Sequence, residues 1–286
     1  MDLPLAIKEV IAFFDLFSFP LTSREIWQFL RQPVGWQTII KILNHSRGDW
    51  EEWQGFYFLP GRRHLVTERE RRYNFSCWKF RRAIFLSRLF AALPTVKAVA
   101  MANLVGQHNL RASSDIDLFI IAKQDRLWTT RLYCVLMTEL LGWRPKPNNK
   151  KDKICLSFFI DESALNLEPL SLDKDDWYFQ YWLANLYFVY GQGDTIKRFY
   201  QANQWIKKHL PNWHEPVFSQ RRFKQAPVKK FFNGSHKLEQ RLFSWQSSKL
   251  KSLYPSFGEG VVISANIAKL HFKDRRQYFI NWVRRF

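Results

Sequence analysis

Two carboxylates separated by one residue, Asp115 and Asp117, open an apolar segment that reads SSDIDLFII over residues 113–121. In a β-strand, side chains repeat on one face every two residues, so these two acids would project together. Neighbouring carboxylates repel each other unless a positive charge lies between them. A hard divalent cation is the natural occupant, and Mg²⁺ is usually held by one or two carboxylates together with substrate phosphates. The pair therefore predicts catalytic residues that bind Mg²⁺ (or Mn²⁺).

The segment before the acids supplies candidates for binding a nucleotide. An apolar strand is predicted over residues 97–102, and a polar loop follows it up to the second strand. Backbone N–H groups of such a loop can bind phosphates, and Asn adopts left-handed backbone angles more readily than other residues with a side chain. We expect the nucleotide to contact Asn103, Gly106, Asn109 and Ser114.

Three further polar residues could take part. Lys123, at the end of the second strand, and Arg131, in the helix predicted after it, are candidate phosphate contacts. The alternative is that both are surface charges exposed to solvent. His108 in the loop could act as a base or proton shuttle, although a polar loop histidine more often has no such role.

The residues Ser114-Asp115-Ile116-Asp117-Leu118 resemble the acid-apolar-acid strand of the DNA polymerase beta-like nucleotidyltransferase superfamily. A longer pattern, with PLT at 20–22, RLWTTR at 126–131 and KICLSFF at 153–159, resembles uncharacterised bacterial nucleotidyltransferase-domain proteins. The resemblance implies transfer of a nucleoside monophosphate from a nucleoside triphosphate to an acceptor. It implies that Asp115 and Asp117 hold the metal.

The chain departs from the family at two places. The family's Gly-Ser position falls on Ala102-Asn103 or Asn103-Leu104. Active members generally carry a third carboxylate on the following strand, where this chain has Cys155 or Ser157, and Asp161 lies at the far end of that strand. Two hypotheses follow: an enzyme acting on RNA, DNA or a small molecule, or a catalytically degenerate protein that binds nucleotide or nucleic acid.

Composition bears on partners and compartment. The formal net charge is +19, which indicates a polyanionic partner such as RNA or DNA, or else a basic surface that is only solvated. The three cysteines show no paired spacing and are expected to be reduced. No leader or membrane-spanning pattern is evident, so we expect a cytoplasmic protein with no membrane partner.

Residues 1–66 have the pattern of a winged helix-turn-helix. Thr22 and Glu25 form a capping-box sequence for a second helix, a third is expected over 36–46, and a strand over 55–59. The third helix of such a module can enter a major groove, although these modules also serve only as packing units.

The remaining chain completes an α+β fold. A second capping-box sequence, Thr67 and Glu70, predicts a solvated basic connecting helix over 67–94. A nucleotidyltransferase-like core of mixed sheet and helices is expected over 95–175, with Asp125 capping its helix. A mainly helical basic region is expected over 176–286, including a buried helix from Asp176 to Tyr190.

Overall fold

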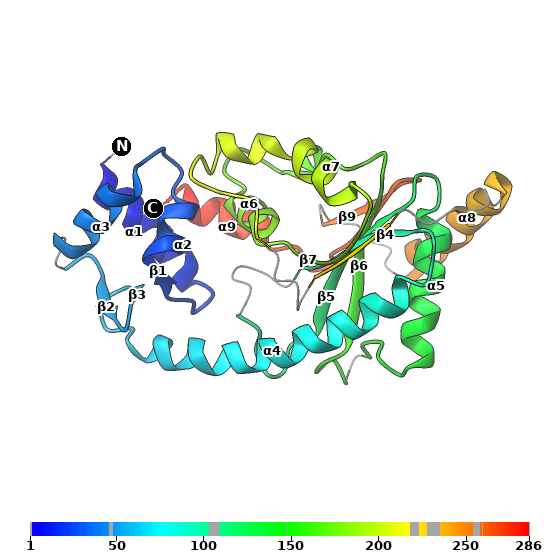
Figure 1. Ribbon diagram of the computed structural model, residues 1–286, viewed down its shortest axis with the longest axis horizontal. Helices are drawn as coiled ribbons and strands as arrows, with labels where there is room; N and C mark the ends of the chain where they lie inside the picture. The colour runs from blue at the N-terminus through cyan, green and yellow to red at the C-terminus, as the bar shows by residue number, and fades with distance from the viewer. Residues whose placement is uncertain are drawn as a thin grey trace.

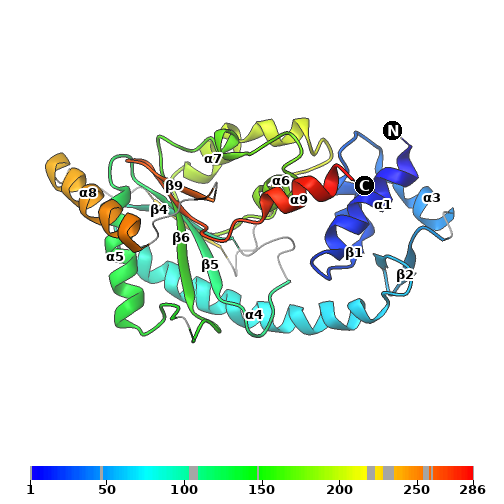
Figure 2. The same cartoon turned by 180° about the vertical axis from the view of Figure 1, so that it is seen from behind.

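The computed structural model describes residues 2–45, 48–102, 109–146, 148–217, 223–227, 235–253, 258 and 260–285. The protein is α+β, as predicted, with a large mixed sheet at one end and a small helical unit at the other (Figure 1). The chain termini both lie at the end that holds the helical unit, as the opposite view also shows (Figure 2).

The N-terminal unit contains three helices and a small sheet. The helices are α1 (Leu3–Asp15), α2 (Ser23–Phe29) and α3 (Trp36–His45). Strands β1 (Leu21–Thr22), β2 (Glu51–Trp53) and β3 (Phe56–Phe58) form an antiparallel sheet in the order β1-β3-β2. The predicted capping box is confirmed, because the Glu25 backbone N–H donates to Thr22 Oγ1 and the Thr22 backbone N–H donates to Glu25 Oε2.

A long helix, α4 (His64–Phe90), runs along one side of the molecule from this unit to the large sheet (Figure 1). It begins before the predicted Thr67, with Arg63 preceding its first turn. The expectation that its polar residues are simply solvated is wrong in part, because Arg72, Ser76 and Lys79 are buried. Their spacing of four and three residues places them on one face of the helix.

The large sheet has seven strands among the described residues, in the order β8-β7-β4-β5-β6-β10-β9. Strand β5 is parallel to β6 and antiparallel to β4, so the sheet is mixed, as predicted. The strands are β4 (Val96–Met101), β5 (Ile116–Ala122), β6 (Ile154–Asp161), β7 (Tyr187–Gln192), β8 (Lys224–Ala226), β9 (Val261–Ile263) and β10 (Ile267–Leu270).

Helices cover more of the described C-terminal region than strands do, as predicted, but the region is not separate from the core. It contributes β7, β8, β9 and β10 to the same sheet as the central strands. The helix expected from Asp176 to Tyr190 is a short helix, α6 (Trp177–Ala184), followed by β7. Asn185 ends α6, and the aromatic and β-branched residues after it favour a strand. The other helices of this region are α7 (Thr195–Ala202), α8 (His236–Leu253) and α9 (Arg276–Val283), with short 3₁₀ turns at Glu168–Leu170 and Gln204–Lys208.

Two hydrophobic cores lie on opposite faces of the large sheet. Alternate residues of β5 divide between them: Phe119 packs in one core with α1, α6, α7 and α9, and Leu118 in the other with α4, α5 (Leu127–Leu140) and α8. This alternation also places Asp117 on the Phe119 face.

The start of α5 corrects another prediction. Glu239 of α8, rather than Asp125, caps the helix by accepting hydrogen bonds from the backbone N–H groups of Trp128 (2.6 Å) and Thr129 (3.1 Å). In the described part of the chain, no helix combines the length and apolar character needed to cross a membrane.

Candidate active site

The two predicted acids and one cysteine converge where β5 and β6 lie side by side. Asp117 and Cys155 are register partners on these parallel strands, and Asp115 immediately precedes β5. One carboxylate oxygen from each acid and the Cys155 sulfur all lie within 4.8 Å of one another, and all three residues are partly buried. Two oxygens and one sulfur at this spacing can contract onto one divalent ion, whose remaining positions would stay open to a ligand.

The surroundings of the two acids favour their protonated forms. Burial and the neighbouring Asp115 carboxylate raise the pKa of Asp117 to about 7, against the opposing effect of a hydrogen bond from the Cys155 thiol. Burial also raises the pKa of Asp115, although Lys150 and Lys79 act in the opposite direction. The Cys155 pKa is raised by burial and by the adjacent carboxylates, so the thiol is neutral. A cation would relieve the repulsion between the acids.

Asp115 and Asp117 border a cavity of about 480 Å³, and Cys155 lies beside them. Its aromatic part combines residues of α6, β6 and α9: the Tyr178 ring stacks on Phe279 with centroids 5.0 Å apart, and Trp182 stacks on Phe158 at 5.4 Å. The cavity volume is within the range for small-molecule sites. Flat aromatic faces beside the acid pair can stack on a planar ligand.

A row of basic residues forms another side of the cavity. Lys269 of β10 and residues 273–276, which include Lys273, Arg275 and Arg276, all contribute to its lining, as does Arg111. None of the C-terminal residues was singled out from the sequence, because they lie more than 150 positions from Asp117 along the chain. They reach it because β10 pairs with β6, where Lys269 is opposite Phe158.

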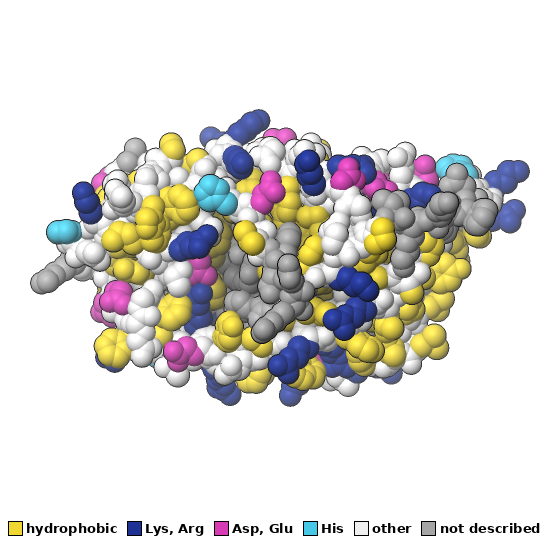
Figure 3. Space-filling model, in the orientation of Figure 1, with side chains coloured by type: hydrophobic (Ala, Val, Ile, Leu, Met, Phe, Trp, Pro, Cys, Tyr) yellow, Lys and Arg dark blue, Asp and Glu magenta, His cyan; other side chains and the backbone are white. Residues whose placement is uncertain are grey.

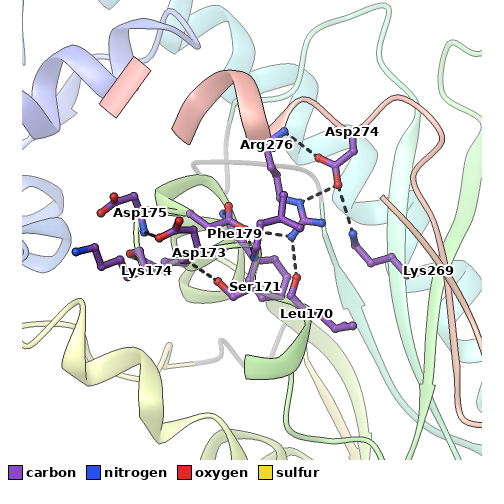
Figure 4. A network of polar contacts seen from close by, with 12 residues as sticks. Leu170, Ser171, Asp173, Lys174, Asp175, Phe179, Lys269, Asp274 and Arg276 are labelled. Atoms are coloured by element: carbon purple, nitrogen blue, oxygen red, sulfur yellow. Dashed lines mark hydrogen bonds and ion pairs between the residues drawn. The ribbon is translucent and has the colours of Figure 1, made fainter. Parts of the chain in front are cut away.

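Figure 4 shows how the basic row is held in place. Asp274 accepts from Arg276 Nε at 2.8 Å and lies 3.5 Å from Lys269 Nζ. Arg276 also donates to the Leu170 carbonyl (2.8 Å) and to Asp176 (3.1 Å), which itself caps α6. Burial and the charge of Arg276 lower the pKa of Lys269 to about 8, so this lysine is still mainly protonated at neutral pH but loses its charge in mildly basic solution.

His271 adds an unpartnered polar atom to the same lining. Its Nδ1 atom is buried and has no hydrogen-bond partner among the residues that the structure describes. Burial and the charge of Lys269 lower the pKa of His271 to about 4, so the ring is neutral at physiological pH. Buried polar atoms are normally satisfied, and a ligand bound in the cavity would be able to pair with this nitrogen.

The buried face of α4 holds the segment that leads into the acids. Arg72 donates to Asn109 Oδ1 (2.6 Å), and Ser76 Oγ accepts from the Leu110 backbone N–H (3.2 Å). Lys79 donates to the carbonyl of Ser114 and forms an ion pair with Asp152 (2.7 Å), two residues before β6. One helix therefore fixes the approach to both strands of the site.

The other predicted contacts have mixed outcomes. Ser114 and Asn109 border the cavity, although the Asn109 side chain is already engaged by Arg72 and the Phe17 carbonyl. The prediction that Lys123 contacts a phosphate is wrong. Lys123 follows the C-terminal end of β5, whereas Asp117 lies near its start, about 20 Å away at the rise of a strand. The prediction that Arg131 contacts a phosphate is wrong as well.

Arg131 is buried between α5 and α8, on the other side of the sheet, and donates to Gln246 (2.6 Å). Predicted contacts at Asn103, Gly106 and His108 lie outside the described residues. Asp161 cannot serve as the third acid, because it lies at the far end of β6 and accepts from the Asp125 N–H and Ser163. Cys155 occupies the position beside Asp117.

No family model, curated protein or solved structure matches the chain. The resemblance in the acid-bearing strand therefore remains a prediction.

Proposed function

We propose that this protein transfers a nucleoside monophosphate from a nucleoside triphosphate to an acceptor, with a divalent cation held by Asp115 and Asp117. One observation carries the proposal: the acid pair shares a cavity with Lys269, Lys273 and Arg275 and with stacked aromatic rings. A metal ligand set, cations for phosphates and flat apolar surfaces for a base are together the features that a nucleotide requires.

Each part of the cavity has a role in this reaction. A bound divalent cation would supply charge neutralisation at the phosphates. The basic row would bind the triphosphate, and the paired Tyr178 and Phe279 rings would stack against the base. The acceptor oxygen forms a bond to the α-phosphorus as the bond from that phosphorus to the α–β bridging oxygen breaks. Pyrophosphate leaves, and the acceptor proton passes to a carboxylate of the acid pair.

The second candidate is a degenerate protein that binds a nucleotide without transferring it. It is favoured by Cys155, which occupies the register position beside Asp117 where active members of the resembled family carry a third acid. Both candidates use the same cavity and the same cation, so binding alone cannot separate them.

For the N-terminal unit we propose a winged helix that packs within the molecule rather than one that reads a nucleic acid. The exposed part of α3 carries a single lysine, Lys41, and the adjacent strand β2 exposes Glu51 and Glu52. Phosphate contacts require a basic surface. Instead, α1 contacts α9 through Phe13 and Phe279, whose ring centroids lie 6.0 Å apart.

The face shown in Figure 3 has no single continuous basic track. In Figure 3, Lys and Arg side chains are dispersed over the visible face among hydrophobic and neutral groups. RNA or DNA therefore stays one acceptor among several, beside small molecules.

The test is label transfer from α-³²P-labelled nucleoside triphosphates, with γ-³²P-labelled ATP as the control for phosphoryl transfer. Total RNA and a small-molecule extract serve as acceptors. The proposal predicts α-label transfer that is lost in Asp115→Asn and Asp117→Asn. Metal-dependent nucleotide binding without any transfer would support the degenerate alternative. Transfer that persists in both variants would overturn the assignment of the acids.

A further inference from the structure

We propose that Cys155 is a metal ligand and that the site selects a thiophilic divalent ion, of the Zn²⁺ and Co²⁺ class, over Mg²⁺. The inference deepens the proposed function, because it concerns which ion the acid pair binds, and it rests on that site holding a metal.

The Cys155 sulfur lies as close to the two carboxylates as a shared metal ion would require. The Cys155 sulfur lies within 4.8 Å of a carboxylate oxygen of each acid, and its strand position is directly opposite Asp117. Sulfur and oxygen ligands of Zn²⁺ sit about 2.0–2.3 Å from the ion. Only a small contraction of the three side chains would therefore place all of them around one ion. The cavity provides room for further ligands at its open positions.

An independent observation points to a ligand in the same cavity. The buried Nδ1 atom of His271 has no hydrogen-bond partner among the described residues, although the ring borders the same cavity as Asp115 and Asp117. A polar group of a metal-bound nucleotide would satisfy this nitrogen.

The chemistry of the third ligand decides the ion. Mg²⁺ takes oxygen ligands and keeps several waters, so a neutral thiol is a poor ligand for it. Zn²⁺ and Co²⁺ bind thiolates well, and a thiol that coordinates such an ion loses its proton. Binding at this site would form one metal–sulfur bond and release the thiol proton to solvent. No oxidant or reductant is needed.

The other described cysteines supply a matched control. Cys77 is half-buried on α4, and Cys134 is fully buried in α5, on the side of the sheet that faces away from the acids. Neither forms a disulfide, and Cys155 does not form one either. A Cys77→Ser variant removes one thiol without touching the proposed ligand set.

The experiment is a titration of the full chain with Co²⁺, followed by its thiolate-to-cobalt charge-transfer absorption. The wild-type protein and Cys77→Ser are expected to develop this band, and about a hundredfold excess of Mg²⁺ is expected to leave it in place. In Cys155→Ser the band is expected to vanish and the Co²⁺ affinity to fall about tenfold or more. Cys155→Asp is expected to lose the band and to gain affinity for Mg²⁺, because it provides a third carboxylate.

Two results would overturn the inference: a band that survives in Cys155→Ser, or Co²⁺ that is displaced by an equal concentration of Mg²⁺. Circular dichroism of each variant shows whether it has folded, and the Cys155→Asp arm keeps the test valid if Cys155→Ser is unstable. The readout is separate from nucleotide transfer. A cobalt–sulfur band without transfer would therefore contradict the enzyme proposal and leave the metal assignment standing.

Discussion

The Nζ atom of Lys79 lies 2.7 Å from a carboxylate oxygen of Asp152, and the same ammonium group donates to the carbonyl of Ser114. Lys79 is 1% exposed, so this ion pair is shielded from solvent on the lysine side. It joins the residue before Asp115 to the turn before β6. The position of the acid pair relative to Cys155 therefore depends on a residue of α4.

Substituting Lys79 should weaken both the fold and the metal site. In Lys79→Met, Asp152 and the Ser114 carbonyl lose a buried donor, and we expect the free energy of unfolding to fall by about 3 kcal/mol. The Co²⁺ affinity should fall as well, because the segment that carries Asp115 is released. Urea unfolding and Co²⁺ titration measure the two effects. Arg81→Met, at an exposed position of the same helix, is the control, and an equal loss of stability there would contradict the role of Lys79.

Arg275 and Arg276 are neighbours with different predicted roles. Arg276 is buried and bonded to Asp176 and Asp274, so Arg276→Met should lower the free energy of unfolding by about 3 kcal/mol or more. Arg275 is exposed at the cavity, so Arg275→Met should keep the stability but weaken nucleotide binding several-fold. Thermal unfolding and ATP titration, run on both variants, separate the effects. Stability losses of equal size would argue against this division.

The raised pKa of Asp117 predicts how stability depends on pH when no metal is bound. The folded protein holds this carboxyl at a pKa of about 7, above its usual value, so ionisation favours the unfolded state. The penalty is absent below about pH 4 and fully developed above about pH 7. Asp117→Asn should therefore be more stable than the wild-type protein at pH 8, by on the order of 1 kcal/mol, and should show little gain at pH 4. Urea unfolding at both pH values, with Glu70→Gln as a surface control, tests this.

Nucleotide binding in the presence of a divalent ion should be strongest between about pH 7 and pH 8. Below this window, protonation of Asp117 opposes metal binding. Above it, Lys269, whose pKa is about 8, loses the charge that attracts phosphate. In Lys269→Arg the decline at high pH should move upward, because a guanidinium stays charged. A decline that is unchanged in this variant would show that Lys269 does not bind the phosphates.

The sequence was sufficient for features that depend on near neighbours. The acid pair repeats with the strand period, and the Thr22–Glu25 capping box is local, so both could be read directly. The strand–helix–strand order around the acids also follows from hydrophobic periodicity, and the structure confirms it as β5, α5 and β6.

Features that depend on distant pairing could not be derived in this way. The basic row reaches the cavity only because β10 pairs with β6, and the run KDRR at 273–276 was its sole local signal. Glu239 replaces Asp125 as the cap of α5 because α8 packs beside that helix end. Arg72 and Lys79 are charged residues of a kind that is normally exposed. Here they are buried, because backbone carbonyls and side chains around the site accept their hydrogen bonds.

The central claim is that the acid pair binds a divalent ion through which a nucleoside triphosphate is held. Isothermal titration of the protein with ATP, with and without Co²⁺, tests it most directly. We expect ATP affinity to rise at least about tenfold with Co²⁺ in the wild-type protein and to show no such rise in Asp117→Asn. Equal ATP affinity with and without the ion in the wild-type protein, or an undiminished rise in Asp117→Asn, would contradict the claim.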